Sequence, residues 1–527
     1  MTALLEVRNL TLDYATGRGS FRALEDVSLS VEAGEVLGLV GESGSGKTSL
    51  AMAVMGHLAG NARLTAGSIR LGGAELTALG PAAMRATLGR RIGMVFQNPS
   101  TSLNPTLTLG RQITEVLERH RGLSGREAWK EAVAWLERVE LRHAEALMRR
   151  YPHEVSGGEK QRVVIATAFA PHPEIVLFDE PTTALDVITG ARILELFHKL
   201  RAETGVAGLY ISHDLGLVAR VAENVAVMRG GRIVETGRAT HLFAHPTHDY
   251  TRRLVDAVPR PHRRLVDDNP GSAELLRAEA IGVSYARRRL FRASPAGGGI
   301  DGVSFAIGEG EILGLVGESG SGKSTVARAL TGLVRATGSL RLDGVPVTRM
   351  RHDYRRAVQI VFQHPDSSLN PRHRVRDILA RPLRLYGGSL AQIPTLLRNV
   401  NLPADYASRW PHQLSGGEKQ RVAIARAFAA RPRLVICDEI TASLDVSVQA
   451  STIELLLQLR RQHGTAYLFI THDLNLIRQI AHRLIVMREG RLVDRLDVKA
   501  LGSGREHPYT RALMAASPLP VGEETGP

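Results

Sequence analysis

Two long motifs each occur twice in the sequence, and this duplication limits the possible folds more than any other feature. Gly41-Glu-Ser-Gly-Ser-Gly-Lys-Thr48 recurs as Gly317-Glu-Ser-Gly-Ser-Gly-Lys-Ser324. Val155-Ser-Gly-Gly-Glu-Lys-Gln-Arg162 recurs as Leu414-Ser-Gly-Gly-Glu-Lys-Gln-Arg421, 259 positions further along. A solenoid of short repeats would have a much shorter period. The duplication therefore predicts one large unit that occurs twice.

A polar segment separates the two copies. Residues 260–275 contain two prolines, a Pro-Gly pair and no apolar period, a composition typical of a linker. We therefore expect a first domain at 1–259, a linker at 260–275 and a second domain at 276–527. Each domain ends in a short C-terminal extension, which begins His245-Pro-Thr-His in the first copy and His507-Pro-Tyr-Thr in the second.

Each copy alternates apolar, strand-like runs with amphipathic, helix-like stretches. Val36-Leu-Gly-Leu-Val and Ile312-Leu-Gly-Leu-Val stand directly before the two glycine-rich motifs. Such alternation is typical of an α/β fold with a mostly parallel sheet.

Composition excludes several other classes of protein. Of the 527 residues 43% are hydrophobic, which excludes a disordered or collagen-like chain. No apolar stretch approaches the roughly 20 residues of a membrane-spanning helix, and the N-terminus lacks the pattern of a signal peptide, so we expect neither. The single cysteine, Cys437, excludes an internal disulfide, a zinc finger and a cysteine-held iron–sulfur cluster, and it fits a reducing compartment.

The net charge of +14 comes mainly from arginines that are scattered through both copies. A basic surface can bind nucleic acid or an anionic membrane. Because the arginines are not gathered in one tail or helix, we interpret them as a solvated surface and expect no nucleic-acid partner; an anionic membrane surface stays open.

The glycine-rich motifs have the pattern of a phosphate-binding loop between a strand and a helix. The backbone N–H groups of Gly41 to Lys47 can converge on phosphate oxygens at the start of the helix. Lys47 would reach the terminal phosphates, and the hydroxyl of Thr48 would bind Mg²⁺. Lys323 and Ser324 repeat this arrangement in the second copy.

Paired carboxylates end a second apolar run in each copy. Asp179-Glu180 follows Ile175-Val-Leu-Phe, and Asp438-Glu439 follows Leu434-Val-Ile-Cys. The spacing predicts that each aspartate holds Mg²⁺ through water and that each glutamate orients the attacking water or accepts its proton.

On these motifs, the chain resembles two nucleotide-binding domains of the ATP-binding cassette (ABC) family fused head to tail. The resemblance implies two P-loop NTPase cassettes, each with a RecA-like parallel-sheet core, an antiparallel β subdomain and a helical subdomain. It also implies that the Ser-Gly-Gly-Glu signature of one domain closes on nucleotide held by the other. Lys47 would then share a site with Ser415–Gly417, and Lys323 with Ser156–Gly158.

The family pattern also assigns further residues. It implies that Gln97 and Gln363 sense Mg²⁺ and the lytic water, that His213 and His472 contact the γ-phosphate, and that Asp186 and Asp445 couple the two sites. It implies that Tyr14 and Tyr285 stack on adenine. One departure is Ile440, which follows Glu439 where Pro181 follows Glu180. Because both copies keep the lysine, glutamate and histidine, we expect two competent ATPase sites.

The complete set of predicted site residues falls into three classes. The predicted catalytic residues are Glu180, Glu439, His213, His472, Gln97 and Gln363. The predicted nucleotide-binding residues are Tyr14, Gly41, Ser43, Gly44, Ser45, Gly46, Lys47, Thr48, Ser49, Ser156, Gly157, Gly158, Asp186, Tyr285, Gly317, Ser319, Gly320, Ser321, Gly322, Lys323, Ser324, Thr325, Ser415, Gly416, Gly417 and Asp445. The predicted metal ligands are Thr48, Gln97, Asp179, Ser324, Gln363 and Asp438, and the cofactors are ATP and Mg²⁺.

Two further segments narrow the resemblance. The loops Gln97-Asn-Pro to Pro105 and Gln363-His-Pro to Pro371, together with the extensions, resemble the ATPases of dipeptide, oligopeptide and nickel importers. That group implies a peripheral subunit at the cytoplasmic face of the inner membrane. Its partners would be two transmembrane permease subunits and, indirectly, an extracytoplasmic solute-binding protein. The cargo stays open among dipeptides, oligopeptides, glutathione-like molecules, opines and nickel chelates.

The alternative is a cytosolic ABC-type translation factor that acts on ribosomes. Such factors are also double cassettes of similar length, and a charge of +14 suits RNA. Two features argue against this alternative. The linker is short and is interrupted by prolines. The sequences Thr183-Ala-Leu-Asp186 and Ala442-Ser-Leu-Asp445 stand where that group has Asn-His-Leu-Asp.

Overall fold

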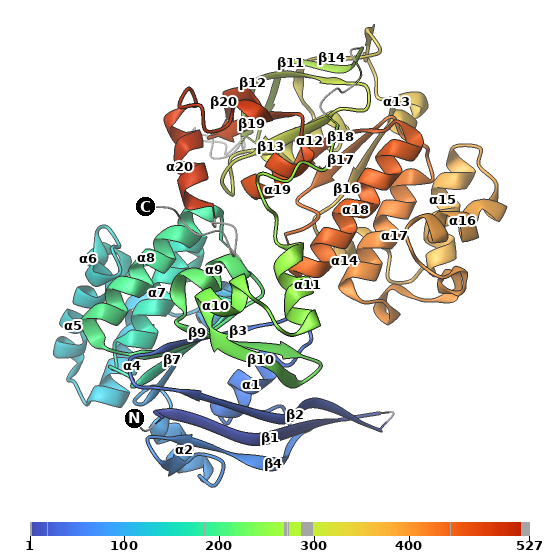
Figure 1. Cartoon of the computed structure of the whole chain (residues 1–527). Helices are drawn as coiled ribbons and strands as arrows, with labels where there is room; N and C mark the ends of the chain where they lie inside the picture. The colour runs from blue at the N-terminus through green and yellow to red at the C-terminus, as the bar shows by residue number, and fades with distance from the viewer. Residues whose placement is uncertain are drawn as a thin grey trace. The chain divides into compact units, whose positions relative to one another are not determined.

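The computed structural model describes residues 3–17, 19–183, 185–267, 271, 273–285, 299–442 and 444–517. The chain separates into two compact units, one built mainly from Met1–Val258 and the other mainly from Pro259–Leu444 and Val448–Ser517 (Figure 1). The domain limits at 259 and 276 stay predictions. Positions 268–270 and 272 of the predicted linker and 518–527 of the predicted second domain lie outside the described residues.

The first unit contains two sheets. A six-stranded sheet has the order β10-β9-β3-β8-β7-β6, with β10 antiparallel to β9 and the other strands parallel. A four-stranded antiparallel sheet has the order β2-β1-β4-β5. The strands are β1 (Leu5–Thr16), β2 (Gly19–Val31), β3 (Val36–Val40), β4 (Ala62–Leu71), β5 (Ala74–Glu75), β6 (Ile92–Val95), β7 (Ile175–Asp179), β8 (Ala207–Ser212), β9 (Asn224–Arg229) and β10 (Arg232–Arg238).

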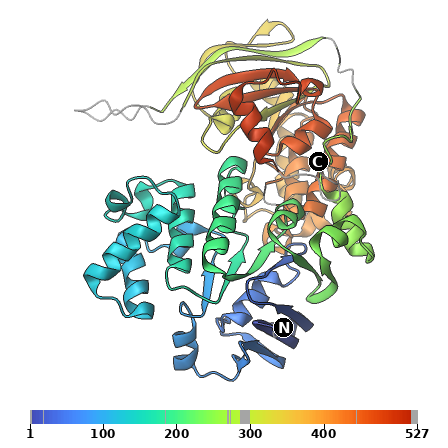
Figure 2. The same ribbon diagram turned by 60° about the vertical axis from the view of Figure 1, so that its left-hand side comes forward.

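The helices of the first unit fall into two groups. Helix α1 packs in one apolar core with both sheets (Figure 1). The segment from α3 to α7, between β6 and β7, forms a helical subdomain (cyan in Figure 2) to one side of the antiparallel strands (dark blue). The helices are α1 (Lys47–Val54), α2 (Pro81–Thr87), α3 (Pro99–Ser102), α4 (Leu109–Arg121), α5 (Gly125–Arg138), α6 (Ala144–Leu147), α7 (Gly157–Phe169), α8 (Val187–Thr204), α9 (Leu215–Val221), α10 (Ala239–Ala244) and α11 (Asp249–Ala257).

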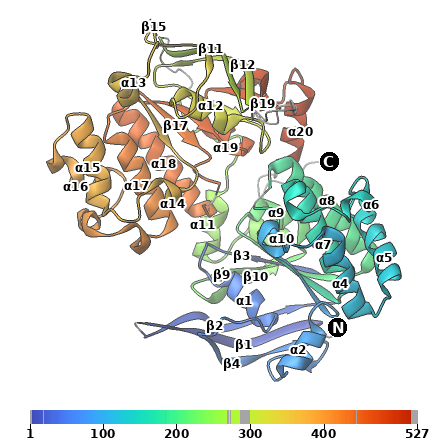
Figure 3. The ribbon, with the colours of Figure 1, turned by 180° about the vertical axis from the view of Figure 1, so that it is seen from behind.

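The second unit repeats this architecture. Its sheets have the orders β16-β17-β18-β13-β19-β20 and β12-β11-β14-β15, and Figure 3 shows α15, α16 and α17 grouped on the side away from β11 and β12. Its strands are β11 (Glu274–Ser284), β12 (Gly299–Gly308), β13 (Ile312–Val316), β14 (Thr337–Leu342), β15 (Val345–Pro346), β16 (Val358–Val361), β17 (Leu434–Asp438), β18 (Ala466–Ile470), β19 (Arg483–Arg488) and β20 (Arg491–Asp497). Its helices are α12 (Lys323–Leu330), α13 (His352–Ala357), α14 (Pro365–Ser368), α15 (Val375–Leu385), α16 (Ile393–Asn399), α17 (Gly416–Phe428), α18 (Val446–His463), α19 (Leu474–Ile480) and α20 (Pro508–Ala516).

The predicted fold class is confirmed. Strands β3, β7 and β8 and their counterparts β13, β17 and β18 are buried along their whole length. Strands of a parallel sheet covered on both faces read as continuous apolar runs, which is the pattern seen in the sequence. No helix in the described part of the chain combines the length and the apolar character needed to cross a bilayer.

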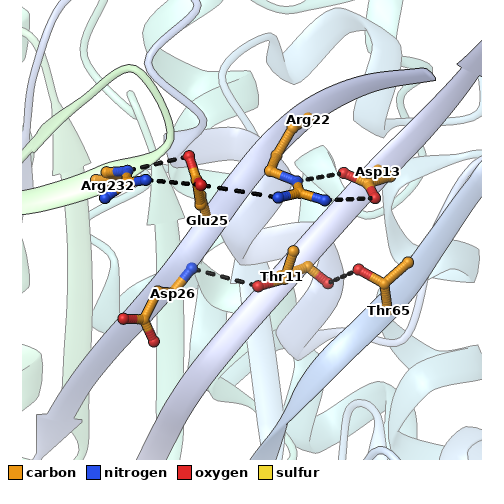
Figure 4. A network of polar contacts seen from close by, with 7 residues as sticks. All are labelled: Thr11, Asp13, Arg22, Glu25, Asp26, Thr65 and Arg232. Atoms are coloured by element: carbon orange, nitrogen blue, oxygen red, sulfur yellow. Dashed lines mark hydrogen bonds and ion pairs between the residues drawn. The ribbon is translucent and has the colours of Figure 1, made fainter. Parts of the chain in front are cut away.

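Ion pairs connect the antiparallel sheet of the first unit to its main sheet. Arg22 on β2 donates from Nε to Asp13 on β1 at 3.0 Å and lies 3.7 Å from Glu25. Glu25 in turn pairs with Arg232 on β10 at 2.6 Å (Figure 4). Because water screens exposed pairs of this kind, they add little to stability, and their effect is to align the strands. The strand they align, β1, carries Tyr14.

Part of the predicted linker packs on the second unit. Arg264 donates from Nη1 to the backbone oxygens of Arg478 and Ala481 at 2.8 and 2.7 Å. Leu265 donates its N–H to the Gln479 oxygen at 2.9 Å. These oxygens lie at the C-terminal end of α19, where a cationic side chain satisfies unpaired carbonyl groups. Arg264 and Leu265 are therefore held by hydrogen bonds to backbone oxygens that the polar composition of the segment did not predict.

Aromatic packing around Phe178 gives a test of the core. Phe178 is 1% exposed, and its ring lies 4.7 Å from that of Phe197 and 5.8 Å from that of Tyr210. We predict that Phe178→Ala lowers the free energy of unfolding by about 3–5 kcal/mol, because it leaves a cavity in the core. Phe21, which is 58% exposed, is the control, and Phe21→Ala should change that free energy by about 0.5 kcal/mol or less. Denaturant unfolding measures both, and equal effects would contradict the assigned core.

Candidate functional site

The glycine-rich loop joins β3 to α1 and depends on its glycines. A Cβ atom at Gly41 would lie 2.2 Å from the Met228 oxygen, and one at Gly46 would lie 2.7 Å from the Ala23 oxygen. Gly46 also has a φ of 106°, a conformation that residues with side chains rarely adopt. The loop is therefore closely packed against its own unit. Before α12, a Cβ atom at Gly317 would lie 2.2 Å from the Met487 oxygen, and one at Gly322 would lie 2.7 Å from a methyl group of Ile300.

A buried lysine closes each loop. Lys47 Nζ donates to the backbone oxygens of Gly41 and Glu42 at 2.7 and 2.8 Å. Lys323 Nζ repeats the contacts with Gly317 and Glu318, both at 2.8 Å. Burial lowers the pKa of Lys47, and the nearby carboxylates of Glu180 and Asp179 oppose that shift. A buried ammonium group that donates to two loop carbonyl groups is suited to gain a further anionic partner such as a phosphate.

A hydroxyl and a carboxylate meet beside each lysine. Thr48 Oγ1 donates to Asp179 Oδ1 at 3.1 Å, and Ser324 Oγ donates to Asp438 Oδ1 at 2.9 Å. Burial raises the pKa of both aspartates, while these hydrogen bonds act in the opposite direction.

This pair of oxygen donors fits Mg²⁺. The ion prefers oxygen ligands and normally uses only one or two carboxylates together with phosphate oxygens of the substrate. The described residues contain no cluster of three or more His, Cys, Asp or Glu side chains that could hold a metal without such a substrate. Gln97 and Gln363, the other predicted ligands, donate from Nε2 to the neighbouring glutamates, and their part in binding the metal stays a prediction.

Glu180 lies at the centre of a polar network in the first unit. Its carboxylate accepts hydrogen bonds from Gln97 Nε2 at 2.9 Å and from Thr183 Oγ1 at 3.1 Å, and His213 Nδ1 lies 3.1 Å from Oε1. Burial favours the neutral acid, but the contact with His213 and the charge of Lys47 lower the pKa of Glu180 overall. Burial acts to lower the pKa of His213, but its contact with Glu180 outweighs this effect and raises that pKa. The network therefore keeps Glu180 ionised and able to accept a proton.

Glu439 has a different set of neighbours in the second unit. Gln363 Nε2 donates to it at 3.1 Å, and its Oε1 lies 3.4 Å from Lys323 Nζ. The described residues show no counterpart there to the pair formed by His213 and Glu180. Glu180 and Glu439 share a left-handed backbone, with φ of 48° and 49°. Such conformations are costly for residues other than glycine and cluster at functional sites.

The signature serines cap helices. Ser156 Oγ accepts from the Glu159 N–H at 3.3 Å at the start of α7, and Ser415 does the same with Glu418 at the start of α17. Gly157 and Gly416 have open space where a side chain would stand. At the next position the space is filled. A Cβ atom at Gly158 would lie 2.9 Å from the Thr189 side chain, and one at Gly417 would lie 2.9 Å from the Val448 side chain. The pairing of each signature with the opposite lysine stays a prediction.

The remaining predicted residues are placed as follows. Tyr14 is half-buried, with its hydroxyl 3.4 Å from Ser49 Oγ, whereas Tyr285 is 43% exposed just after β11. Asp186 caps α8 by accepting from Thr189, and Asp445 accepts from Ser447 at 3.0 Å. Ala184 and Ser443, in the segments that precede these aspartates, lie outside the described residues.

Inside each glycine-rich loop one serine hydroxyl is buried. Ser45 Oγ and Ser321 Oγ have no hydrogen-bond partner among the described residues. A buried hydroxyl without a partner is costly, and a phosphate oxygen is one acceptor that would satisfy it. Ser43, Gly44, Ser319 and Gly320 complete the loops, and Thr325 follows Ser324 in the first turn of α12.

Sequence reasoning missed four residues that hold the loops. The Tyr250 hydroxyl accepts the Glu42 N–H at 3.0 Å, and the Tyr509 hydroxyl accepts the Glu318 N–H at 2.9 Å. The N–H groups of Gly231 and Gly490 donate to the oxygens of Ser45 and Ser321, both at 3.0 Å. The sequence held one sign of them. Tyr250 and Tyr509 are 259 residues apart, as are Gly231 and Gly490, and the repeated signature motifs have the same separation.

Comparison with known proteins gives matches along nearly the whole chain. A family described as "ABC transporter" matches residues 24–183 and 300–442. A second, described as "Oligopeptide/dipeptide transporter, C-terminal region", matches residues 234–294, which include the extension of the first unit.

Three relatives match this chain over almost its whole length. "Uncharacterized ABC transporter ATP-binding protein YejF" of Escherichia coli K12 is 40% identical, with 98% of this chain and 99% of the relative covered. "Peptidoglycan transport ATP-binding protein YejF" of Agrobacterium fabrum is 40% identical, with coverage of 98% and 96%. "Glutathione import ATP-binding protein GsiA" of Escherichia coli O157:H7 is 38% identical, with coverage of 98% and 90%.

The pair formed by Glu180 and His213 gives a titration test. Because His213 has a raised pKa, its ion pair is fully formed below the ordinary histidine pKa of about 6.5 and is lost as pH rises through the raised value. We predict that Glu180→Gln lowers the pKa of His213, since burial then acts without the carboxylate. NMR titration of labelled histidine measures this, with Glu439→Gln as the control. An unchanged pKa in Glu180→Gln would contradict the pairing.

Proposed function

The chain belongs to the ABC transporter family, and on this premise we propose that it is the ATP-hydrolysing subunit of an importer for peptides or related small solutes. The observation that carries the proposal is the presence in one chain of two sets of lysine, hydroxyl, aspartate and glutamate, in which the lysine and the hydroxyl make the same contacts in both copies. The match of 234–294 to the oligopeptide and dipeptide transporter region supports the class of solute. The relatives named for peptidoglycan and glutathione transport support small peptide-like cargo.

We propose that each ATP site is completed by the other half of the chain. Lys47 and Thr48 would bind the phosphates of one nucleotide, and Ser415–Gly417 would contact the same nucleotide from the start of α17. Lys323 and Ser324 would act in the same way with Ser156–Gly158 at the start of α7. The capped starts of α7 and α17 support this role, because a helix start favours negative charge and the sites at Gly157 and Gly416 are open.

The residues beside each phosphate loop suit the hydrolysis of ATP to ADP and phosphate. The Thr48 hydroxyl and the Asp179 carboxylate would hold Mg²⁺, which when bound would supply positive charge beside the phosphates. Glu180 accepts the proton of the attacking water, or orients that water, while Gln97 positions the carboxylate. His213 holds the other carboxylate oxygen and presents its ring beside the terminal phosphate. Glu439 and Gln363 would have the corresponding roles in the second half, with Lys323 beside the other carboxylate oxygen of Glu439. There His472 would contact the terminal phosphate without holding the glutamate.

The proposed partners follow from the transport role. Two transmembrane permease subunits would receive the movement that ATP binding produces, and a solute-binding protein outside the membrane would deliver cargo to them. The chain would bind peripherally at the cytoplasmic face of the membrane, where an anionic lipid surface suits its charge of +14. The alternative of a ribosome-binding translation factor receives no support from the reported relatives, whose names describe transporters or import.

Replacing both glutamates tests the function. We predict that the double variant Glu180→Gln, Glu439→Gln still binds ATP but hydrolyses it at least about 100-fold more slowly, because the proton acceptor is lost while the shape is kept. Solute uptake by proteoliposomes that contain the variant and its permease should then stop.

The control for this experiment is Glu174→Gln. Glu174 is an exposed partner of Arg91 outside both sites, so this variant should keep wild-type uptake. Normal uptake by the double variant would show that ATP hydrolysis at these residues does not drive transport.

A further inference from the structure

The C-terminal extension of each unit makes a direct contact with the phosphate loop of the same unit. Helix α11 has Tyr250 as its second residue, and the hydroxyl of Tyr250 accepts the backbone N–H of Glu42 at 3.0 Å. In the second unit Tyr509 of α20 accepts the N–H of Glu318 at 2.9 Å. The two contacts occur at equivalent positions in both copies, so a chance contact is a poor explanation.

Each tyrosine is fixed by the same kind of cap. In the first unit His248 Nδ1 accepts the Tyr250 N–H at 3.0 Å, and the Glu235 carboxylate accepts the N–H groups of Thr247 and His248 at 2.8 and 3.2 Å. The Arg229 guanidinium lies 5.0 Å from the centre of the tyrosine ring.

The second unit has equivalent anchors. His507 Nδ1 accepts the Tyr509 N–H at 3.1 Å, and Asp494, the counterpart of Glu235, accepts from the His507 N–H and from Thr510 Oγ1, both at 2.7 Å. Arg488 lies 5.2 Å from the ring of Tyr509. In both units the hydroxyl therefore reaches the loop from a firmly held helix start.

The peptide that the tyrosine contacts also holds the lysine. The N–H of Glu42 and the C=O of Gly41 belong to one planar, trans peptide group and point to opposite sides of it. Tyr250 accepts the N–H, while Lys47 donates to the oxygen at 2.7 Å. Rotation of this peptide would break both hydrogen bonds at once. The hydroxyl thus fixes the direction of the carbonyl group that positions Lys47 Nζ.

The protonation state of the hydroxyl suits this role. Burial raises the pKa of Tyr250 to about 12, so the group stays neutral at physiological pH. A neutral hydroxyl can accept the N–H without placing a negative charge beside the phosphate loop.

We propose that Tyr250 and Tyr509 are positioning residues for ATP, and that each extension thereby sets the ATP affinity of the phosphate loop in its own unit. The proposal rests on the proposed function in one respect, namely that the two loops bind ATP. It gives the extensions a role that the motifs alone do not assign.

The test compares tyrosine-to-phenylalanine variants of the full-length chain. Tyr250→Phe and Tyr509→Phe remove only the hydroxyl, and each should weaken equilibrium binding of ATP with Mg²⁺ at one site about three- to tenfold, the range for one lost neutral hydrogen bond. The KM for ATP should rise by a similar factor, while kcat stays within about twofold, because Glu180 and Glu439 are untouched. Tyr467→Phe is the matched control, since its buried hydroxyl donates to the Leu456 oxygen at 2.8 Å, away from the loop. Its ATP affinity should equal that of the wild type.

A chain that carries Lys47→Ala separates the effects at the two sites. With Lys47→Ala, the peptide no longer has a lysine to position, so Tyr250→Phe should cause no further loss of binding, whereas Tyr509→Phe should keep its full effect. Wild-type ATP affinity in a folded Tyr250→Phe variant would overturn this inference but not the proposed function. An equal loss of ATP affinity in Tyr467→Phe would do the same. A wild-type chain that binds no ATP would overturn the proposed function and this inference with it.

Discussion

The buried ammonium group of Lys47, and that of Lys323 in the second copy, is the constraint on which the rest of each unit depends. A charge that is removed from water needs strong polar partners. Here the partners are two backbone oxygens of the glycine-rich loop, reinforced by the charges of Glu180 and Asp179. The loop can offer those oxygens only if its backbone turns tightly, and the packing around Gly41 and Gly46 explains why no side chain fits there.

The elements around the loop hold it from several directions. Strand β3 leads into it, the N–H of Gly231 holds the Ser45 oxygen, and the Tyr250 hydroxyl holds the Glu42 N–H. The ion pair between Glu25 and Arg232 aligns β2 with β10, and the turn between β9 and β10 carries Gly231. Each of these contacts is small in energy, but together they fix a peptide group whose oxygen positions the lysine.

Sequence reasoning succeeded where chemistry is carried by a contiguous motif. The pairing of Thr48 with Asp179, 131 residues apart, could be predicted because both residue types are part of recognisable phosphate and metal motifs. The same holds for the strands, because a covered parallel sheet leaves continuous apolar runs.

The contact of Tyr250 with Glu42, across 208 residues, could not be predicted, because the donor is a backbone N–H and any residue type except proline has one. The docking of Arg264 on the end of α19 was missed for the same reason, since its acceptors are backbone oxygens. The different neighbours of Glu180 and Glu439 depend on side-chain positions that two such similar motifs do not specify.

We propose that each ATP site combines the lysine of one half with the signature of the other. This pairing can be measured by a double-mutant cycle of ATP hydrolysis in which Lys47→Ala is combined in turn with Ser415→Arg and with Ser156→Arg. We expect Lys47→Ala and Ser415→Arg to damage the same site, so that the pair is little worse than either change alone and hydrolysis at the other site persists. Lys47→Ala with Ser156→Arg should instead damage both sites and abolish hydrolysis. The reverse pattern, in which Lys47 is coupled to Ser156 and not to Ser415, would contradict the claim.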